Sequence, residues 1–112
     1  MSLYEKLIKT FENCNVEAYL NLLDENYVFI RHQSNQEVKK NDWKQTVTGM
    51  FEAMKKGNLK FENNRCIYEN EEILVMHSIG HFPDNTKEAI IAVHILLDGK
   101  IIKTESGATR ID

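Results

Sequence analysis

The segment AIIAVHILL, residues 89–97, is the feature that most restricts how this chain can fold. It is rich in β-branched residues and continues through Asp98-Gly99, a strong signal for a two-residue β-hairpin, into a second apolar arm. A strand with one face in water alternates apolar and polar residues, and this one does not. We therefore expect a hairpin whose first strand is covered on both faces.

The rest of the chain divides into helices first and strands last. Apolar residues at helical spacing predict helices over 3–11, 16–23 and 43–54. Asn15 is a suitable N-cap for the second helix, and Asn41 or Asp42 for the third. Runs of β-branched and aromatic residues predict a short arm near Val38 and strands over 27–32, 59–68, 73–82, 87–97 and 100–108. This order indicates an α+β domain spanning 1–112, with three helices packed on one face of an antiparallel sheet.

The turns predict which side chains share a sheet face. A loop symmetric about Asp84 and Asn85 pairs Phe82 with Lys87, and side chains then alternate along each strand. The face under the helices is expected to be apolar and free of acids. The opposite face is expected to mix apolar residues with histidines, namely His77, Ile79, Ile90, Ala92, His94 and Leu96. That face is too apolar for water and no helix remains to cover it, so we expect a homodimer through these residues.

Composition argues against several classes of function. The 14 basic and 17 acidic residues form no basic stripe, so neither nucleic acid nor a membrane surface is an expected partner. Glu5 and Lys6 interrupt the place where a signal peptide would be apolar, and the longest apolar run is too short to span a bilayer. Cys14 and Cys66 are expected as free thiols, with a disulfide between them as the alternative. We expect a cytoplasmic location.

The stretches NVEAYLNLLDENYVFI (15–30) and AVHILLDGKIIK (92–103), within this order of helices and strands, resemble the nuclear transport factor 2-like superfamily. That superfamily contains ketosteroid isomerases, SnoaL-like cyclases and scytalone dehydratases. The resemblance, to a branch without characterised function, implies a cystatin-like cone with a curved sheet. It also implies a pocket between the long helix and the concave face, and dimers through the outer face.

The resemblance can be tested against the catalytic residues of the isomerases. Their oxyanion-binding tyrosine, their general base and their second acid match Leu7, Arg31 and Val93 here. A guanidinium group stays protonated and cannot act as a base near neutral pH. Isomerase chemistry of that kind is therefore disfavoured.

Arg31 and His32 are the candidate polar residues at the end of the first predicted strand. An inward Arg31 could hold a carboxylate or enolate oxygen through two hydrogen bonds, and a rim arginine paired with a nearby acid is the alternative. His32 is the candidate general acid or base, by residue type, and a solvated strand-end histidine is its alternative.

The remaining candidates are expected to surround the pocket. They are Tyr27, Trp43, Arg65, Met76, Thr104 and Ser106. Arg65 belongs to this set only if the strand is regular through Asn63 and Asn64, because a bulge there would turn it outward. Histidine spacing argues against a shared metal ion, and a site formed by His77 and His94 is the one alternative kept open.

The sequence thus predicts a small-molecule-binding domain with an apolar pocket, no cofactor and no metal. The ligand is unknown and is expected to include an anionic or carbonyl oxygen near Arg31. Lyase, isomerase or hydrolase activity through His32 is one rival interpretation. A non-catalytic dimerisation or accessory module is the other, and a pocket filled by Trp43, Phe51 and Met54 would favour it.

Overall fold

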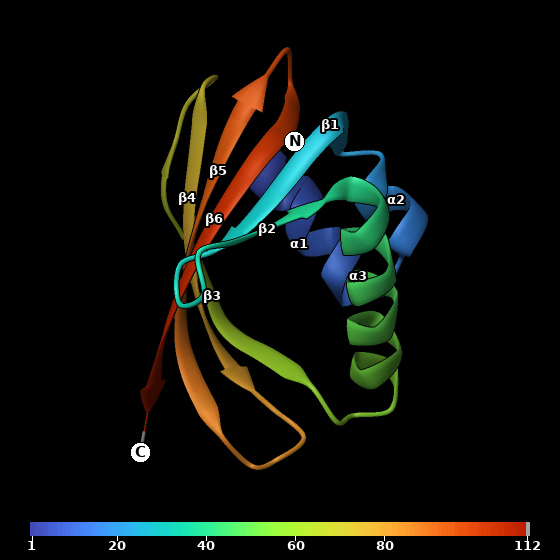
Figure 1. The fold of residues 1–112 in the computed structure, drawn as a ribbon, viewed down its shortest axis with the longest axis vertical. Helices are drawn as coiled ribbons and strands as arrows, with labels where there is room; N and C mark the ends of the chain where they lie inside the picture. Colours follow the sequence, from blue (N-terminus) through green and yellow to red (C-terminus); the bar gives the residue numbers. More distant parts are fainter. Residues whose placement is uncertain (112) are drawn as a thin grey trace.

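In the computed structural model, which describes residues 1–111, three helices lie against one face of a strongly curved sheet (Figure 1). The helices are α1 (Leu3–Glu12), α2 (Val16–Leu20) and α3 (Lys40–Lys55). The strands are β1 (Leu23–Arg31), β2 (Gln36–Lys39), β3 (Lys60–Glu69), β4 (Ile73–His81), β5 (Lys87–Leu97) and β6 (Lys100–Ile111). We call the face toward the helices the inner face and the opposite one the outer face.

The sheet of the described residues has the order β2-β1-β6-β5-β4-β3. Strands β3 to β6 form the predicted antiparallel meander, and β2 pairs with β1 in the same sense. The predicted α+β class is confirmed. The sheet is mixed rather than purely antiparallel, because the first strand, β1, runs parallel to the last strand, β6.

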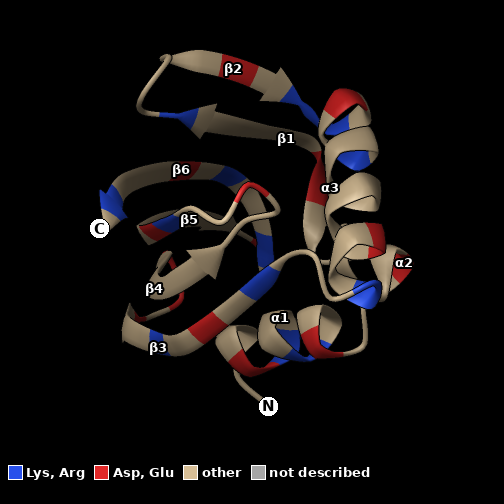
Figure 2. Cartoon of the chain, turned by 90° about the horizontal axis from the view of Figure 1, so that it is seen from below, with Lys and Arg blue, Asp and Glu red and all other residues tan. Residues whose placement is uncertain are grey.

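Acidic and basic residues are interspersed over helices and strands (Figure 2).

The helix starts follow local sequence in two of three cases. Ser2 and Glu5 form a capping box at α1, and the Asn15 side chain accepts a hydrogen bond from the backbone of Ala18 at α2, as predicted. The predicted cap of α3 is wrong, since Lys39 precedes the helix without a side-chain hydrogen bond. Strand β2 runs directly into α3, so pairing with β1 fixes the chain direction where a cap would otherwise do so.

The β4–β5 hairpin differs from the prediction by one residue, and the difference reverses a whole strand. Phe82 N–H donates to the Thr86 carbonyl, and His81 pairs with Lys87. The loop therefore has three residues, with Asn85 at φ 68°, the left-handed position of this hairpin class. Because side chains alternate along a strand, every residue of β5 lies on the face opposite to the predicted one.

A bulge in β6 then restores the predicted face for the following residues. The Asp98-Gly99 turn forms as expected, with both φ angles positive. Leu96 pairs with Ile101 but Ile95 pairs with Lys103, so Ile102 is an extra residue in its strand. Ile101 is therefore buried in the core rather than on the outer face. Thr104 pairs with His94 and lies on the inner face as predicted, but beside different partners.

The core lies between the helices and the inner face of the sheet. Its fully buried side chains are aromatic and aliphatic and come from α1, α3, β1, β4 and β6. They are Leu7, Leu23, Tyr27, Val47, Phe51, Leu74 and Ile101. Phe51 and Phe11 pack edge to face, and Phe11 stacks on Phe61 across the wider part of the sheet. The cavity described below adjoins this core, since Leu7 and Tyr27 belong to the core and also line the cavity.

Candidate functional site

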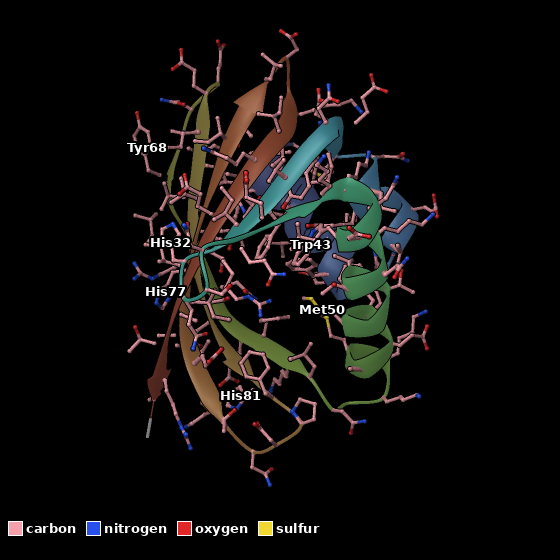
Figure 3. The ribbon with its side chains drawn as sticks, viewed as in Figure 1. His32, Trp43, Met50, Tyr68, His77 and His81 are labelled. Atoms are coloured by element: carbon pink, nitrogen blue, oxygen red, sulfur yellow. The ribbon has the colours of Figure 1, made fainter. Side chains whose placement is uncertain are left out.

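A cavity of about 290 Å³ lies between the helices and the inner face of the sheet. All three helices and all strands except β2 contribute to its wall. Figure 3 shows Trp43 and Met50 on this side of the sheet, pointing from α3 toward the strands. The predicted Tyr27, Arg31, Trp43, Met76, Thr104 and Ser106 all line it. Phe51 is packed in the core and does not line it.

Aromatic side chains form one wall of the cavity. Trp43 stacks on Phe29 with 3.9 Å between ring centroids, and its indole N–H donates to the Tyr19 hydroxyl at 2.8 Å. Burial raises the pKa of Tyr19 to about 12, and the hydrogen bond from Trp43 opposes that rise. The guanidinium carbon of Arg31 lies 5.9 Å from the Phe29 ring centroid, so Arg31 continues this stack toward the cavity mouth.

His94 is the buried titratable group of the cavity. Its Nδ1 lies 2.7 Å from the Thr104 hydroxyl oxygen, and its Nε2 is buried without a hydrogen-bond partner among the described residues. Burial lowers the pKa of His94 to about 4, so the imidazole is neutral near pH 7. A neutral imidazole has one N–H and one lone pair, and Nε2 can therefore donate or accept according to the tautomer.

Tyr27 is the second buried group with unused hydrogen-bonding capacity. Its side chain is almost fully enclosed, and its hydroxyl makes no hydrogen bond of ordinary geometry within residues 1–111. Burial raises its pKa, the nearby Tyr19 raises it further, and Thr104 opposes the rise. Thr104 is thus a neighbour of both Tyr27 and His94, which places two unpartnered polar atoms around one hydroxyl.

The reversed face of β5 corrects the predicted dimer surface. Ile90, Ala92 and His94 line the cavity, and Leu96 packs against the core, so these four residues do not belong to the outer face. Of the six predicted residues, His77 and Ile79 remain there, because they pair with the outward residues Ile91 and Ala89. Figure 3 shows His77 on the side of the sheet away from α3.

The same reversal corrects two statements about acidic and catalytic positions. Glu88 lines the cavity, so the inner face is not free of acids. Val93, matched to the second acid of the isomerases, lies on the outer face, and the inward residues beside it are Ala92 and His94. Leu7 and Arg31 do line the cavity and supply neither a hydroxyl nor a base.

His32 and Arg65 lie on the outer face and not at the cavity. His32 Nε2 is 3.0 Å from a carboxylate oxygen of Glu105, and both side chains are partly exposed. The predicted role of His32 at the pocket mouth is therefore wrong, because neighbouring residues of a strand point to opposite faces and Arg31 points inward. Arg65 pairs with His77 after the bulge at Asn63, whose φ is 54°, so the outward alternative holds.

The histidines cannot form the two-residue metal site that the sequence left open. His77 lies on the outer face and His94 on the inner face, so the sheet separates them. Within the described part of the chain, no three His, Cys, Asp or Glu residues are grouped to hold a metal ion. Cys14 and Cys66 are free. No helix among residues 1–111 is long and apolar enough to cross a membrane.

The arrangement suits binding better than proton transfer. A base whose conjugate acid has a pKa of about 4 is a weak proton acceptor near pH 7, so His94 is poorly matched to general base catalysis. The same burial makes its hydrogen bonds to an uncharged ligand strong, because water does not compete there. Sequence reasoning missed His94 and Glu88, although the Pro-Asp-Asn triplet at 83–85 is a pattern of three-residue hairpins.

Comparison with known proteins places the fold among characterised architectures. The profile of the SnoaL-like domain matches residues 1–97. A proposed ketosteroid isomerase from Kribbella flavida superposes with a TM-score of 0.78 and 12% identity, over 96% of this chain and 76% of that one. An NTF2-like protein of unknown function from Cytophaga hutchinsonii superposes with a TM-score of 0.73 and 16% identity, over 95% and 96%.

A SnoaL-like protein of unknown function from Burkholderia thailandensis is similar in the same way. Its TM-score is 0.70 at 11% identity, over 96% of this chain and 91% of that one. At these identities the likeness establishes the fold alone. No curated protein matches the chain.

Proposed function

Since the chain belongs to the SnoaL-like domain family, we propose that residues 1–112 act as one small-molecule-binding domain, with the ligand in the cavity of about 290 Å³. The NTF2-like fold expected from the sequence is confirmed. A cavity of roughly 150 Å³ accepts benzene, so this one suits a compact molecule with one substituted ring or a fused pair.

The observation that supports binding is the pair of unpartnered polar atoms, Tyr27 Oη and His94 Nε2. A buried hydroxyl or imidazole nitrogen without a partner costs about 1–3 kcal/mol each, and folded proteins rarely leave two such atoms beside one cavity. A ligand oxygen that bonds to them offsets this cost. The apolar residues around them, Leu7, Met50 and Met76 among others, would contact the body of the ligand.

Filling the cavity tests the proposal. Ala92→Phe places a ring in the cavity, and Ala89→Phe places the same ring on the outer face of the same strand. We expect ligand-observed NMR to detect binding of p-cresol, a neutral ring with one hydroxyl, to the unchanged protein and to Ala89→Phe. Binding should be absent from Ala92→Phe.

The fold of each variant is checked by its far-ultraviolet circular dichroism. Equal binding of p-cresol to both variants would show that the cavity is not the site. Absence of binding to the unchanged protein, for p-cresol and for neutral cyclic ketones alike, would remove the proposal.

A homodimer through the outer face is a second proposal, now with a corrected surface. Ile91 is 44% exposed at the centre of that face, with Val75, Ile79, Val93 and Ile95 around it. Ile91→Lys should convert a dimer into monomers in sedimentation velocity at micromolar concentration, whereas Ile90→Val on the inner face should not. A monomeric unchanged protein would contradict the dimer.

The predicted cytoplasmic location is likewise a proposal. It is supported by the two free thiols, of which Cys66 is exposed, because an exposed thiol persists in a reducing compartment. Lyase or isomerase activity is less well supported than binding, because His94, the imidazole of the cavity, has a pKa of about 4 and is a weak base near pH 7. The observation that would have favoured a non-catalytic module is not found, since Phe51 and Met54 do not fill the cavity.

A further inference from the structure

Polar groups on the inner face are arranged in rows defined by the strand register. One row runs across four neighbouring strands, each residue paired with the next, and contains Leu74, His94, Thr104 and Phe29. The next row contains Met76, Ala92, Ser106 and Arg31. Because the first row is buried and Arg31 is exposed, the cavity opens on the side of Arg31.

The cavity therefore has two polar anchors on one axis. At its closed end are Tyr27 Oη and His94 Nε2, which lack partners, and at its mouth is the Arg31 guanidinium. The row of His94 and the row of Arg31 are two residues apart, which corresponds to about 7 Å along a strand, and Tyr27 lies two residues farther along β1 than the row of His94. One ring or a short chain of carbon atoms spans such a separation.

Arg31 is oriented but has no anionic partner among the described residues. The ion pairs of residues 1–111 do not include it, in contrast to His32, which is paired with Glu105. Its guanidinium lies over the Phe29 ring, which is itself stacked on Trp43. Ala92 is the β5 residue in the row of Arg31. Glu88 lies two rows beyond Ala92 along β5 and is therefore not in direct contact with Arg31.

We propose that the ligand is a compact aromatic or alicyclic carboxylate with a hydroxyl or carbonyl oxygen at the opposite end of the ring. The carboxylate binds Arg31 at the mouth, and the opposite oxygen bonds to Tyr27 and His94 at the closed end. This inference rests on the proposed function, and it adds the ligand class and its direction in the cavity. The tyrosine hydroxyl and the neutral imidazole together accommodate either oxygen, since the hydroxyl can donate or accept and Nε2 can donate or accept according to the tautomer.

Isothermal titration calorimetry with 4-hydroxybenzoate, benzoate and p-cresol tests the inference, because each probe after the first lacks one anchor group. We expect 4-hydroxybenzoate to bind about tenfold or more tightly than p-cresol, the size of a charge-assisted hydrogen bond, and about threefold or more tightly than benzoate, the size of a neutral one. Arg31→Met should weaken 4-hydroxybenzoate and benzoate and leave p-cresol unchanged. Tyr27→Phe should weaken 4-hydroxybenzoate and p-cresol and leave benzoate unchanged.

Arg65→Met is the matched control, since it removes the same charge from the outer face and should leave all three affinities unchanged. If p-cresol binds as tightly as 4-hydroxybenzoate and Arg31→Met has no effect, the inference is overturned while binding in the cavity stands. If Arg65→Met and Arg31→Met weaken 4-hydroxybenzoate equally, the effect is one of net charge and the inference is overturned. If none of the three probes binds and neutral cyclic ketones do not bind either, the proposed function fails with the inference.

Discussion

The two faces of the sheet place the same residue type in opposite environments. On the inner face His94 is 7% exposed, contacts Thr104 and has no carboxylate within ion-pair distance in the described structure. On the outer face His32 and His81 contact Glu105 and Glu62 and remain partly exposed. These contacts lower the pKa of both glutamates.

This comparison separates the energetic roles of the two faces. On the inner face, burial favours neutral groups, so an unpartnered polar atom there is costly to the fold and available to a ligand. On the outer face, water screens the ion pairs, so each contributes little to stability. Substitutions matched across the two faces should therefore differ in size and in pH dependence.

The largest difference is expected for truncation of a leucine. Leu74 on β4 is completely buried on the inner face, whereas Leu97 at the end of β5 is 49% exposed. Leu74→Ala should lower the free energy of unfolding by about 2–5 kcal/mol, and Leu97→Ala by less than about 1 kcal/mol. Urea denaturation followed by circular dichroism measures both, and equal losses would mean that the faces are not distinct.

The next difference is pH dependence. The pKa of His94 is about 4 in the fold and roughly 6.5 in the unfolded chain, so below pH 6.5 the unfolded state binds a proton that the folded state does not. Stability is therefore lost as pH falls, by about 2 kcal/mol between pH 7 and pH 5. Urea denaturation of His94→Leu should not show this loss.

His77→Leu on the outer face is the control and should retain the loss. Thr104 and Tyr27 face His94 and do not titrate in this range, and Glu88 lies at the other end of the cavity. Glu62 and Glu105 have lowered pKa values, so their contribution is lost only below about pH 4.5, outside the interval. An unchanged slope in His94→Leu would contradict the neutral buried histidine.

A smaller effect of opposite sign is expected for Tyr27. Its hydroxyl is buried without a partner, so Tyr27→Phe removes the cost of burying it and should raise the free energy of unfolding by about 1 kcal/mol. Tyr68→Phe, at a side chain 56% exposed, should change nothing measurable. Thermal unfolding compares the two, and a destabilised Tyr27→Phe would indicate a partner for the hydroxyl.

The smallest effect is expected for the outer ion pairs. Glu105→Gln removes the charge from the contact with His32 and should change the free energy of unfolding by less than about 1 kcal/mol, less still in high salt. Urea denaturation at low and high salt measures it. A loss comparable to that of Leu74→Ala would place Glu105 in a buried interface.

The elements that could be predicted are those determined by neighbours in sequence. Asn15 caps α2, Asp98-Gly99 forms the hairpin turn, and the order of helices and strands led to the NTF2-like fold. The sequence left open whether Arg31 points inward or lies at the rim, and the structure places it in the lining of the cavity. His32 failed as a site residue because alternation places it on the other face, beside Glu105.

Face assignments beyond a turn could not be predicted in the same way. One residue more or less in the loop after Phe82 exchanges the inner and outer side chains of all of β5, and a bulge at Ile102 exchanges them again in β6. The prediction missed both the loop length and the bulge. For Thr104 and Ser106 the two errors cancelled, so their predicted face was correct, whereas for His94 only the first error applied and its predicted face was wrong. Loop length and bulges depend on contacts made by the whole sheet, so local patterns leave them open.

The sequence by itself determined the helices, the strands, their order and therefore the family, because capping residues, turn residues and apolar periodicity act over a few neighbouring positions. The continuous apolar run of β5 also predicts cover on both of its faces, and cover of the outer face stays a prediction. The tertiary structure alone decided which face holds His94, Ala92 and Glu88, since that depends on register. Register pairs Thr104 with His94, and Tyr27 of β1 is a neighbour of Thr104, so the two unpartnered polar atoms come from strands that are far apart in sequence.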